Sequence, residues 1–286
     1  MLTEVKAYSS WPSAPTLLLD DTGRAETDLV QIRNIDGLNP VKATVNTSLF
    51  GSVDGSSYTG GSIASRNIVL TLHPNPDWDI WTYESIRKLL YQYFMPKKPT
   101  RLVFHSEDMN PVEIIGIVES VEANPFTKDQ EFQVSVICPD PYFTAIDPTI
   151  VTFQAVRPGG SIYEIDYKGN IETGMHVNVT WGSDPAPTYI AIQIGDPAAL
   201  GAITYFQTAA TVSASKYFEL NSVPMKKYVQ NVDIGTGLIT NLLSKTQISE
   251  GSSWPSFVPG LNYFSVITDQ GNQDWELTYY ERFGGL

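Results

Sequence analysis

Apolar and polar residues alternate one by one along most of this chain, and this pattern constrains the fold more than any other feature. In one clear stretch, Phe132, Val134 and Val136 alternate with Gln133 and Ser135. Successive side chains of a β-strand point to opposite faces of a sheet, so the pattern is typical of strands that bury one face. The sequence therefore predicts a mainly β protein.

Composition supports short strands joined by many turns. The chain has 286 residues, including 21 Gly, 19 Pro and 12% aromatic residues. Gly and Pro favour turns, and aromatic side chains favour strands. A chain of this length has room for two domains. Strands at short, regular spacing in the second half predict a β-sandwich there.

One segment departs from the alternation and predicts a helix from about residue 83 to residue 94. Its apolar residues recur at helical spacing. They are Tyr83, Ile86, Leu90 and Tyr93. Thr82 is suited to cap the amino end, Glu84 suits the positive end of the helix dipole, and Pro96 stops the helix. The apolar stripe is expected to cover an open sheet.

Two further features organise the first half. Residues 51–65 are rich in Gly and Ser and are expected to form a long mobile loop. Pro139 and Pro141 end a strand and stiffen the exit from it. We therefore expect a β domain with one helix over 1–147 and a β-sandwich over 148–286.

No residue pattern indicates an enzyme. The sequence has no Gly-rich nucleotide loop and no nucleophile motif, and His73, His105 and His176 have no second ligand at metal spacing. Cys138 ends an apolar alternation and is expected to be a buried, inert thiol. No catalytic residue, cofactor or metal is predicted.

Charge and hydropathy limit the partners. The net charge is −13, which argues against binding nucleic acid by neutralising its phosphates. No apolar run approaches the length of a membrane-spanning helix. Residues 1–15 contain no apolar segment typical of a signal peptide, so synthesis in the cytoplasm is expected.

Several strings, in order, resemble the distal tail protein (Dit) family of long-tailed siphophages. The strongest is VEIIGIVESVEANPFTKDQEFQVSVICPDPYF, which resembles the family's hairpin and its Cys-Pro-Asp-Pro-Tyr-Phe end. The resemblance extends over almost the whole chain. Its strings occupy residues 35–46, 65–72, 83–104, 112–143, 257–266 and 277–286.

The resemblance implies a fold and a role. The fold is an amino-terminal β domain with one helix, followed by a galectin-like β-sandwich. The role is structural: a homohexameric ring at the tail tip of the virion, made in the host cytoplasm, with a channel through which DNA passes. The implied partners are the tail tube protein, a tail-associated lysin or hub protein, and receptor-binding or baseplate proteins. This chain resembles the short type, without inserted carbohydrate-binding modules.

The ring that the resemblance implies offers an explanation for the negative charge. Carboxylates that line a channel repel DNA phosphates, so DNA would slide through without specific binding. Solubility alone is the other explanation of the charge.

A carbohydrate-binding, receptor-recognition protein of the tail is the alternative function, and a wall-degrading enzyme is a third. Galectins use a His-x-Asn-x-Arg string, but here Thr180 stands where the arginine would be, after His176 and Asn178. A threonine hydroxyl cannot replace a guanidinium, so these residues read as the solvent face of a strand. The candidate aromatic platforms for a sugar are Trp181, Trp254 and Trp275, of which the first and last alternate like core residues.

The ring contacts are expected within residues 1–147, with the sandwich outside the ring. A long polar loop is often ordered by a neighbouring subunit. Phe50 and Tyr58 are its candidate apolar contacts, and Arg66 is a candidate partner for a carboxylate of the next subunit. A fragment ending near residue 147 is therefore expected to form rings by itself.

Overall fold

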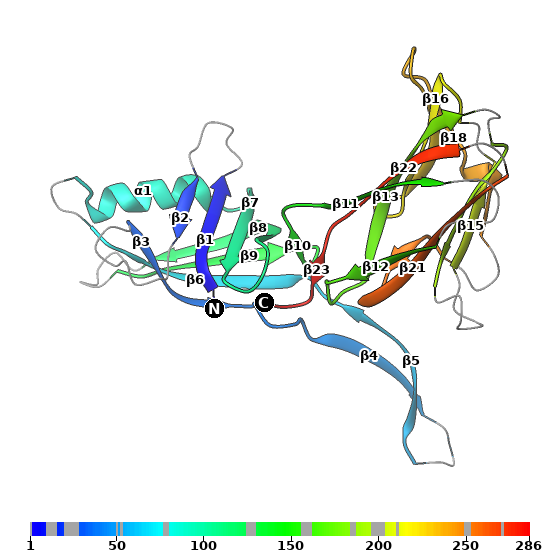
Figure 1. Cartoon of the computed structure of the whole chain (residues 1–286). Coiled ribbons are helices and arrows are strands. Elements are labelled where there is room, and N and C mark those ends of the chain that lie inside the picture. Colours follow the sequence, from blue (N-terminus) through cyan, green and yellow to red (C-terminus); the bar gives the residue numbers. More distant parts are fainter. Residues whose placement is uncertain are drawn as a thin grey trace. The chain divides into compact units, whose positions relative to one another are not determined.

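The computed structural model divides the chain into two compact units (Figure 1). Unit 1 consists of residues 1–146 and 283–286, and unit 2 of residues 147–282. All structural statements concern the described residues, which are 2–9, 16–19, 29–49, 51, 54–76, 80–123, 130–155, 162–183, 187–195, 204–209, 212–248, 253–269 and 272–286.

Unit 1 is built on one antiparallel sheet, which we call the amino-terminal sheet. Its strands, in spatial order, are β2 (Leu17–Leu19), β1 (Leu2–Ser9), β7 (Pro99–Ser106), β8 (Val112–Ala123), β9 (Phe132–Cys138), β6 (Arg66–Pro74) and β3 (Val30–Asp36). The short strands β10 (Phe143–Ala145) and β23 (Arg282–Phe283) extend it beside β8. β8 and β9 are antiparallel neighbours, so the hairpin that the family resemblance implied within residues 112–143 is present.

The helix α1 (Tyr83–Tyr93) contributes to the same hydrophobic core as this sheet. Ile86, Leu90 and Tyr93 are buried, as predicted, and Phe94 after the helix is buried with them. They pack in one cluster with inward-facing strand residues such as Val136. The helix therefore closes one face of the sheet, which is the role that its apolar stripe predicted.

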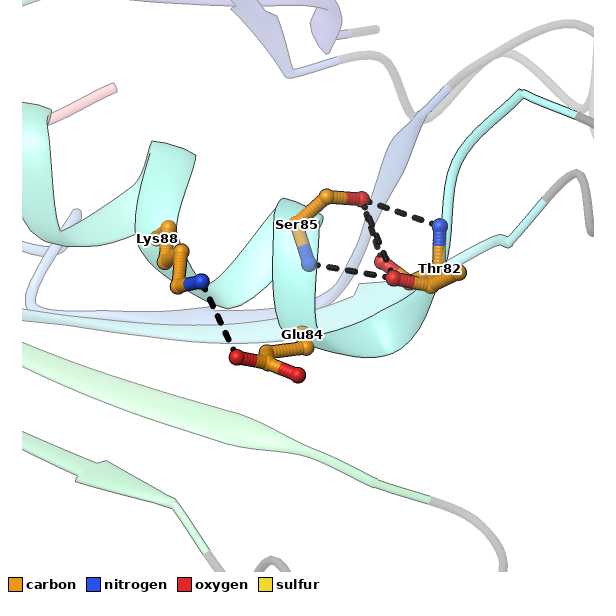
Figure 2. A network of polar contacts seen from close by, with 4 residues as sticks. All are labelled: Thr82, Glu84, Ser85 and Lys88. Atoms are coloured by element: carbon orange, nitrogen blue, oxygen red, sulfur yellow. Dashed lines mark hydrogen bonds and ion pairs between the residues drawn. The ribbon is translucent and has the colours of Figure 1, made fainter.

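The amino end of α1 is capped by side chains (Figure 2). The Thr82 hydroxyl accepts a hydrogen bond from the Ser85 backbone N–H at 3.3 Å, and the Thr82 N–H donates to the Ser85 hydroxyl at 2.9 Å. This reciprocal pair satisfies backbone donors that the helix itself leaves free. Glu84 and Lys88 add an exposed ion pair one turn apart, at 2.9 Å. The predicted cap is confirmed.

Three strands of unit 1 were not expected from the sequence. β1 and β2 lie before residue 28, where no clear strand was predicted. Val5 and Ala7 of β1 are both buried, but Ala7 is too small to stand out in an apolar pattern. The third is β5 (Ser56–Ile63), which falls in the stretch expected to be a loop.

Unit 2 is a sandwich of two sheets. The front sheet has the order β11 (Thr149–Ala155), β22 (Asn272–Tyr279), β13 (Thr173–Ser183), β16 (Lys216–Asn221), β17 (Tyr228–Asp233) and β18 (Ile239–Asn241), with β20 (Ser256–Phe257) beside β13. The back sheet has the order β12 (Ile162–Tyr167), β21 (Gly260–Thr268), β14 (Ile190–Ile194), β15 (Thr204–Thr208) and β19 (Thr246–Ile248). A short 3-10 helix, Leu243–Lys245, precedes β19.

One core lies between the two sheets of unit 2. Val177 and Trp275 of the front sheet pack in the same cluster as Ile192 and Phe264 of the back sheet. The rings of Phe153 and Trp275 stack, with centroids 5.9 Å apart. The prediction that Trp275 is a core residue is confirmed, whereas the side chain of Trp181 lies outside the described part. The predicted fold class, a β domain with one helix followed by a β-sandwich, is confirmed.

Leu90 provides a test of the packing of α1. Replacing Leu90 by Ala is expected to lower the free energy of unfolding by about 2–5 kcal/mol, because the change removes buried methyl groups and leaves a cavity. Lys88→Ala on the exposed side of the same helix is the control, with an expected loss of about 0.5 kcal/mol or less. Urea denaturation followed by circular dichroism measures both. Equal losses for the two variants would contradict the packing described here.

Candidate functional site

A two-stranded hairpin is the most exposed element of unit 1. Strand β4 (Ala43–Leu49) pairs with β5, and within the described residues these two strands form a sheet of their own (Figure 1). Every residue of β4 is exposed, and β5 is nearly as exposed. We call residues 43–63 the arm.

The expectation of a loop over 51–65 was wrong because it assumed that a strand must bury one face. In the arm, β4 and β5 satisfy each other's backbone hydrogen bonds, and neither face is covered by unit 1. Gly60 adopts a φ of +142° within β5, a conformation that residues with a side chain rarely adopt. The Gly and Ser content therefore reflects a hairpin with two exposed faces.

The arm presents large apolar side chains to solvent. Leu49 is 81% exposed and Tyr58 is 68% exposed. Val45 and Ile63 are also exposed. A lone two-stranded hairpin has little stability of its own, and exposed apolar side chains gathered on one element mark an interaction surface. The arm is therefore suited to packing against another protein surface.

Arg66 lies at the base of the arm and is 1% exposed. Its guanidinium donates hydrogen bonds to backbone carbonyl oxygens of four residues from separate parts of unit 1. The acceptors are Gly37, Asn39, Pro141 (2.6 Å from Nε) and Gly284. The same guanidinium lies 4.5 Å from the centroid of the Phe143 ring. No carboxylate is among these partners. The charge of the guanidinium is instead stabilised by the dipoles of the backbone carbonyls and by the face of the Phe143 ring.

We call this arrangement the clamp: Arg66, the carbonyls that it binds and the Phe143 ring. It joins the residues before the arm to the residues after it, because Gly37 and Asn39 precede β4 and Arg66 follows β5. Gly37 has a φ of +92°, and a Cβ there would lie 2.0 Å from the Asn67 carbonyl oxygen. Only glycine fits at this position.

The residues 284–286 complete the clamp from the other side of the sequence. Gly284 provides one acceptor for Arg66, and the Leu286 N–H donates to the Leu38 carbonyl at 3.0 Å. A Cβ at Gly285 would lie 2.7 Å from a side-chain carbon of Pro40. These residues are therefore structural parts of unit 1, although in the sequence the whole of unit 2 lies between them and the rest of that unit.

Cys138 faces Arg66 across the β6–β9 pair. It is fully buried, and burial raises the pKa of its thiol to about 12, although the Arg66 charge acts in the opposite direction. Burial also lowers the pKa of Arg66, with Cys138 opposing the shift. A thiol with so high a pKa is protonated at neutral pH and is a poor nucleophile.

The three residues predicted to contact a neighbouring subunit have different outcomes in the structure. Tyr58 is exposed on the arm, where a contact with a neighbour remains a prediction. Phe50 lies outside the described residues. Arg66 does not fit its predicted role, because its guanidinium is buried and bonded to carbonyls of its own unit. The sequence signal that was missed is the Gly37 turn, which brings a carbonyl against Arg66.

Among the described residues, His, Cys, Asp and Glu side chains nowhere form a group of three or more that could hold a metal ion. In the same residues, no helix has the length and apolar character needed to cross a membrane.

Arg66→Met tests the clamp. We expect unfolding free energy to fall by about 3–5 kcal/mol, because several buried carbonyls lose their donor at once. Arg101→Met is the matched control: Arg101 forms a partly exposed ion pair with Glu113, and its loss should cost about 1 kcal/mol or less. Thermal and urea denaturation measure both variants. An Arg66→Met protein as stable as Arg101→Met would show that the clamp contributes little.

Comparisons with known proteins agree with this architecture. Residues 25–138, which include the arm and Arg66, match the family described as phage tail protein RIFT-related domain. The crystal structure of the Dit protein (gp 19.1) of phage SPP1, described as a paradigm of the hub adsorption apparatus of phages that infect Gram-positive bacteria, has a TM-score of 0.65 at 12% identity, over 98% of this chain and 99% of that one.

Other similarities are weaker. A chain of the phage P2 baseplate in its activated conformation has a TM-score of 0.46 at 12% identity, covering all of both chains. A fructofuranosidase of Schwanniomyces occidentalis has a TM-score of 0.26 at 7% identity, over 84% of this chain and 59% of that one. No curated protein matches the sequence. Residues 25–138 therefore match a phage tail RIFT-related domain, and nearly the whole chain shares the fold of the SPP1 Dit protein, which agrees with the family resemblance seen in the sequence.

Proposed function

We propose that this protein is the structural hub of a long-tailed phage tail tip. In this role it assembles as a homohexameric ring that joins the tail tube to the host-binding apparatus. The observation that carries the proposal is the exposed arm, which lies within the phage tail domain and presents apolar side chains that its own unit does not cover. A ring of identical subunits provides each arm with the same receiving surface.

The proposal assigns the subunit contacts to unit 1. The arm of one subunit packs on the amino-terminal sheet of the next. There, Ile115 and Ile117 of β8 are exposed, although they alternate along the strand with buried residues. Two neighbouring isoleucines on an open sheet face are a suitable partner for Leu49 and Tyr58. Unit 2 then remains available for other contacts.

The clamp supports the same arrangement. Arg66, which follows the arm, donates hydrogen bonds to the carbonyls of Gly37 and Asn39, which precede it, so the two ends of the arm are tied together. The arm therefore extends from a rigid joint that is already formed in the single chain. Such preorganisation lowers the entropy that assembly must remove.

The finer features of the role follow from the ring. The neighbours are the tail tube protein on one side and a tail-associated lysin or hub protein on the other, with receptor-binding or baseplate proteins around them. The protein is made in the host cytoplasm and becomes part of the virion. DNA passes through the channel without specific binding, which suits a chain with a net charge of −13. We assign no catalytic activity.

The fragment ending near residue 147, which was expected from the sequence to form rings by itself, is not the whole of unit 1. A chain that ends near residue 147 lacks Gly284 and Leu286, and so lacks parts of the clamp and of unit 1. We therefore expect such a fragment to be less stable than unit 1 in the full chain. Ring formation is best tested with the full chain.

The arm provides the decisive variant. The full chain is expected to form a hexamer, observed as rings by electron microscopy and by size exclusion with light scattering. Replacing Leu49 and Tyr58 by Asp is expected to weaken each contact by about 2–4 kcal/mol and to yield folded monomers. The melting temperature of the monomer should not fall, because both side chains are exposed.

Ile239→Asp is the matched control, since Ile239 is an exposed apolar residue of unit 2. This variant should retain the hexamer. The opposite pattern, with rings lost in the control and kept in the arm variant, would move the subunit contacts to unit 2 and overturn the proposal. A full chain that is monomeric at every concentration would also contradict self-assembly.

A further inference from the structure

The sequence contains two Asp-Gly pairs, and the structure places them in opposite surroundings. Asp36-Gly37 lies at the end of β3 and enters the clamp, whereas Asp54-Gly55 lies in the arm, directly before β5. At an Asp-Gly pair the glycine has no side chain to hinder the approach of its backbone nitrogen to the aspartate carboxyl group. The same intramolecular reaction is therefore chemically available at both pairs.

The pair in the arm is open. Asp54 and Gly55 are both exposed, and among the described residues the Asp54 carboxylate has no hydrogen-bond or ion-pair partner. Gly55 has a φ of +102°, and a Cβ added there would have no described atom within 4 Å. The pairing of β5 with β4 begins only at Ser56, opposite Leu49. No described contact therefore opposes the rotation that brings the Gly55 nitrogen to Asp54 Cγ.

The pair in the clamp is held on both sides. Asp36 is paired with Val69 in the β3–β6 ladder, and the Gly37 carbonyl accepts a hydrogen bond from the Arg66 guanidinium. The Asn67 carbonyl oxygen lies only 2.0 Å from the place where a Cβ of Gly37 would be, so this backbone is closely packed. Rotation of the peptide group between Asp36 and Gly37 requires the clamp to open first.

We propose that Asp54 is a site of spontaneous isomerisation to isoaspartate and that the clamp protects Asp36 from the same reaction. The Gly55 backbone nitrogen attacks Asp54 Cγ and loses its proton. A C–N bond forms, and one carboxyl oxygen leaves as water, which gives a five-membered succinimide ring. Water then adds to the main-chain carbonyl carbon of Asp54 and breaks its bond to the nitrogen. The water that was lost is thus regained, and the reaction needs no oxidant, reductant or cofactor.

The product changes the arm without changing the clamp. The chain now runs through the side chain of Asp54, which adds a carbon atom to the main chain just before β5, while the former main-chain carbonyl becomes the free carboxylate. The charge of the residue is kept. This modification goes beyond the hub role and does not rest on it, because the reaction takes place within a single chain.

Heavy-oxygen labelling of the full-length protein tests the proposal. Each opening of a succinimide by water enriched in oxygen-18 leaves one heavy oxygen in the residue. After incubation at neutral pH, trypsin digestion in ordinary water yields peptides 34–42 and 43–66, whose only acidic residues are Asp36 and Asp54 respectively. Tandem mass spectrometry locates the label and the isoaspartate. We expect Asp54 to be labelled at least about tenfold faster than Asp36, because only Asp36 must wait for local opening.

Three controls separate the structural effect from the intrinsic chemistry. In concentrated urea the two aspartates should be labelled at similar rates, since the clamp is lost there. Asp54→Glu keeps the charge but requires a six-membered ring, which closes more slowly, so peptide 43–66 should lose its label while Asp36 is unaffected. The variant with Asp at positions 49 and 58 is measured beside the parent protein, so that a ring that covers the arm does not hide the reaction.

Three results would overturn the proposal. They are equal labelling of Asp36 and Asp54 in the folded chain, an unlabelled Asp54 in both the parent protein and the arm variant, and undiminished labelling of peptide 43–66 in Asp54→Glu. Light scattering on the same samples reports ring assembly separately, so failure of one proposal does not count against the other.

Discussion

The buried charge of Arg66 is the interaction on which unit 1 depends. Four carbonyls bind this guanidinium, and they come from before the arm, from the strand exit near Pro141 and from Gly284. Each segment alone has irregular backbone with polar groups that must be satisfied. Arginine can serve all of them because its donors form a fixed fork and because it does not lose its proton when buried. Lysine, with a single ammonium group, could not reach carbonyls on so many sides.

Much of the fold could be predicted from local pattern. Alternation located the strands that have one buried face, such as the one containing Val134, and helical spacing located Ile86, Leu90 and Tyr93. These patterns succeed where burial divides a strand or helix into two unlike faces. They failed for Ala7, whose side chain is too small to mark a face, and for β5, which has no buried face at all.

The candidate sites depend on contacts between residues far apart in the sequence, so pattern revealed only parts of them. Tyr58 is exposed on the arm, but nothing near Arg66 in sequence indicated that Gly284 would be its partner. The galectin comparison drew attention to His176, Asn178 and Thr180. A polar pocket on the front sheet is lined by the last two of these, together with Asp274 and Glu276, which the pairing of β13 with β22 places opposite them. That register is set by the fold of the whole sandwich.

The position of Gly284 also bears on the order in which the molecule is completed. A ribosome makes residues 1–146 first, then all of unit 2, and only afterwards residues 283–286. Until then the buried guanidinium of Arg66 lacks one of its acceptors, and Leu38 lacks the N–H of Leu286. A chain interrupted anywhere within unit 2 thus holds its arm on an incomplete joint. The base of the arm is therefore completed by residues that are made last among those of unit 1, after all of unit 2.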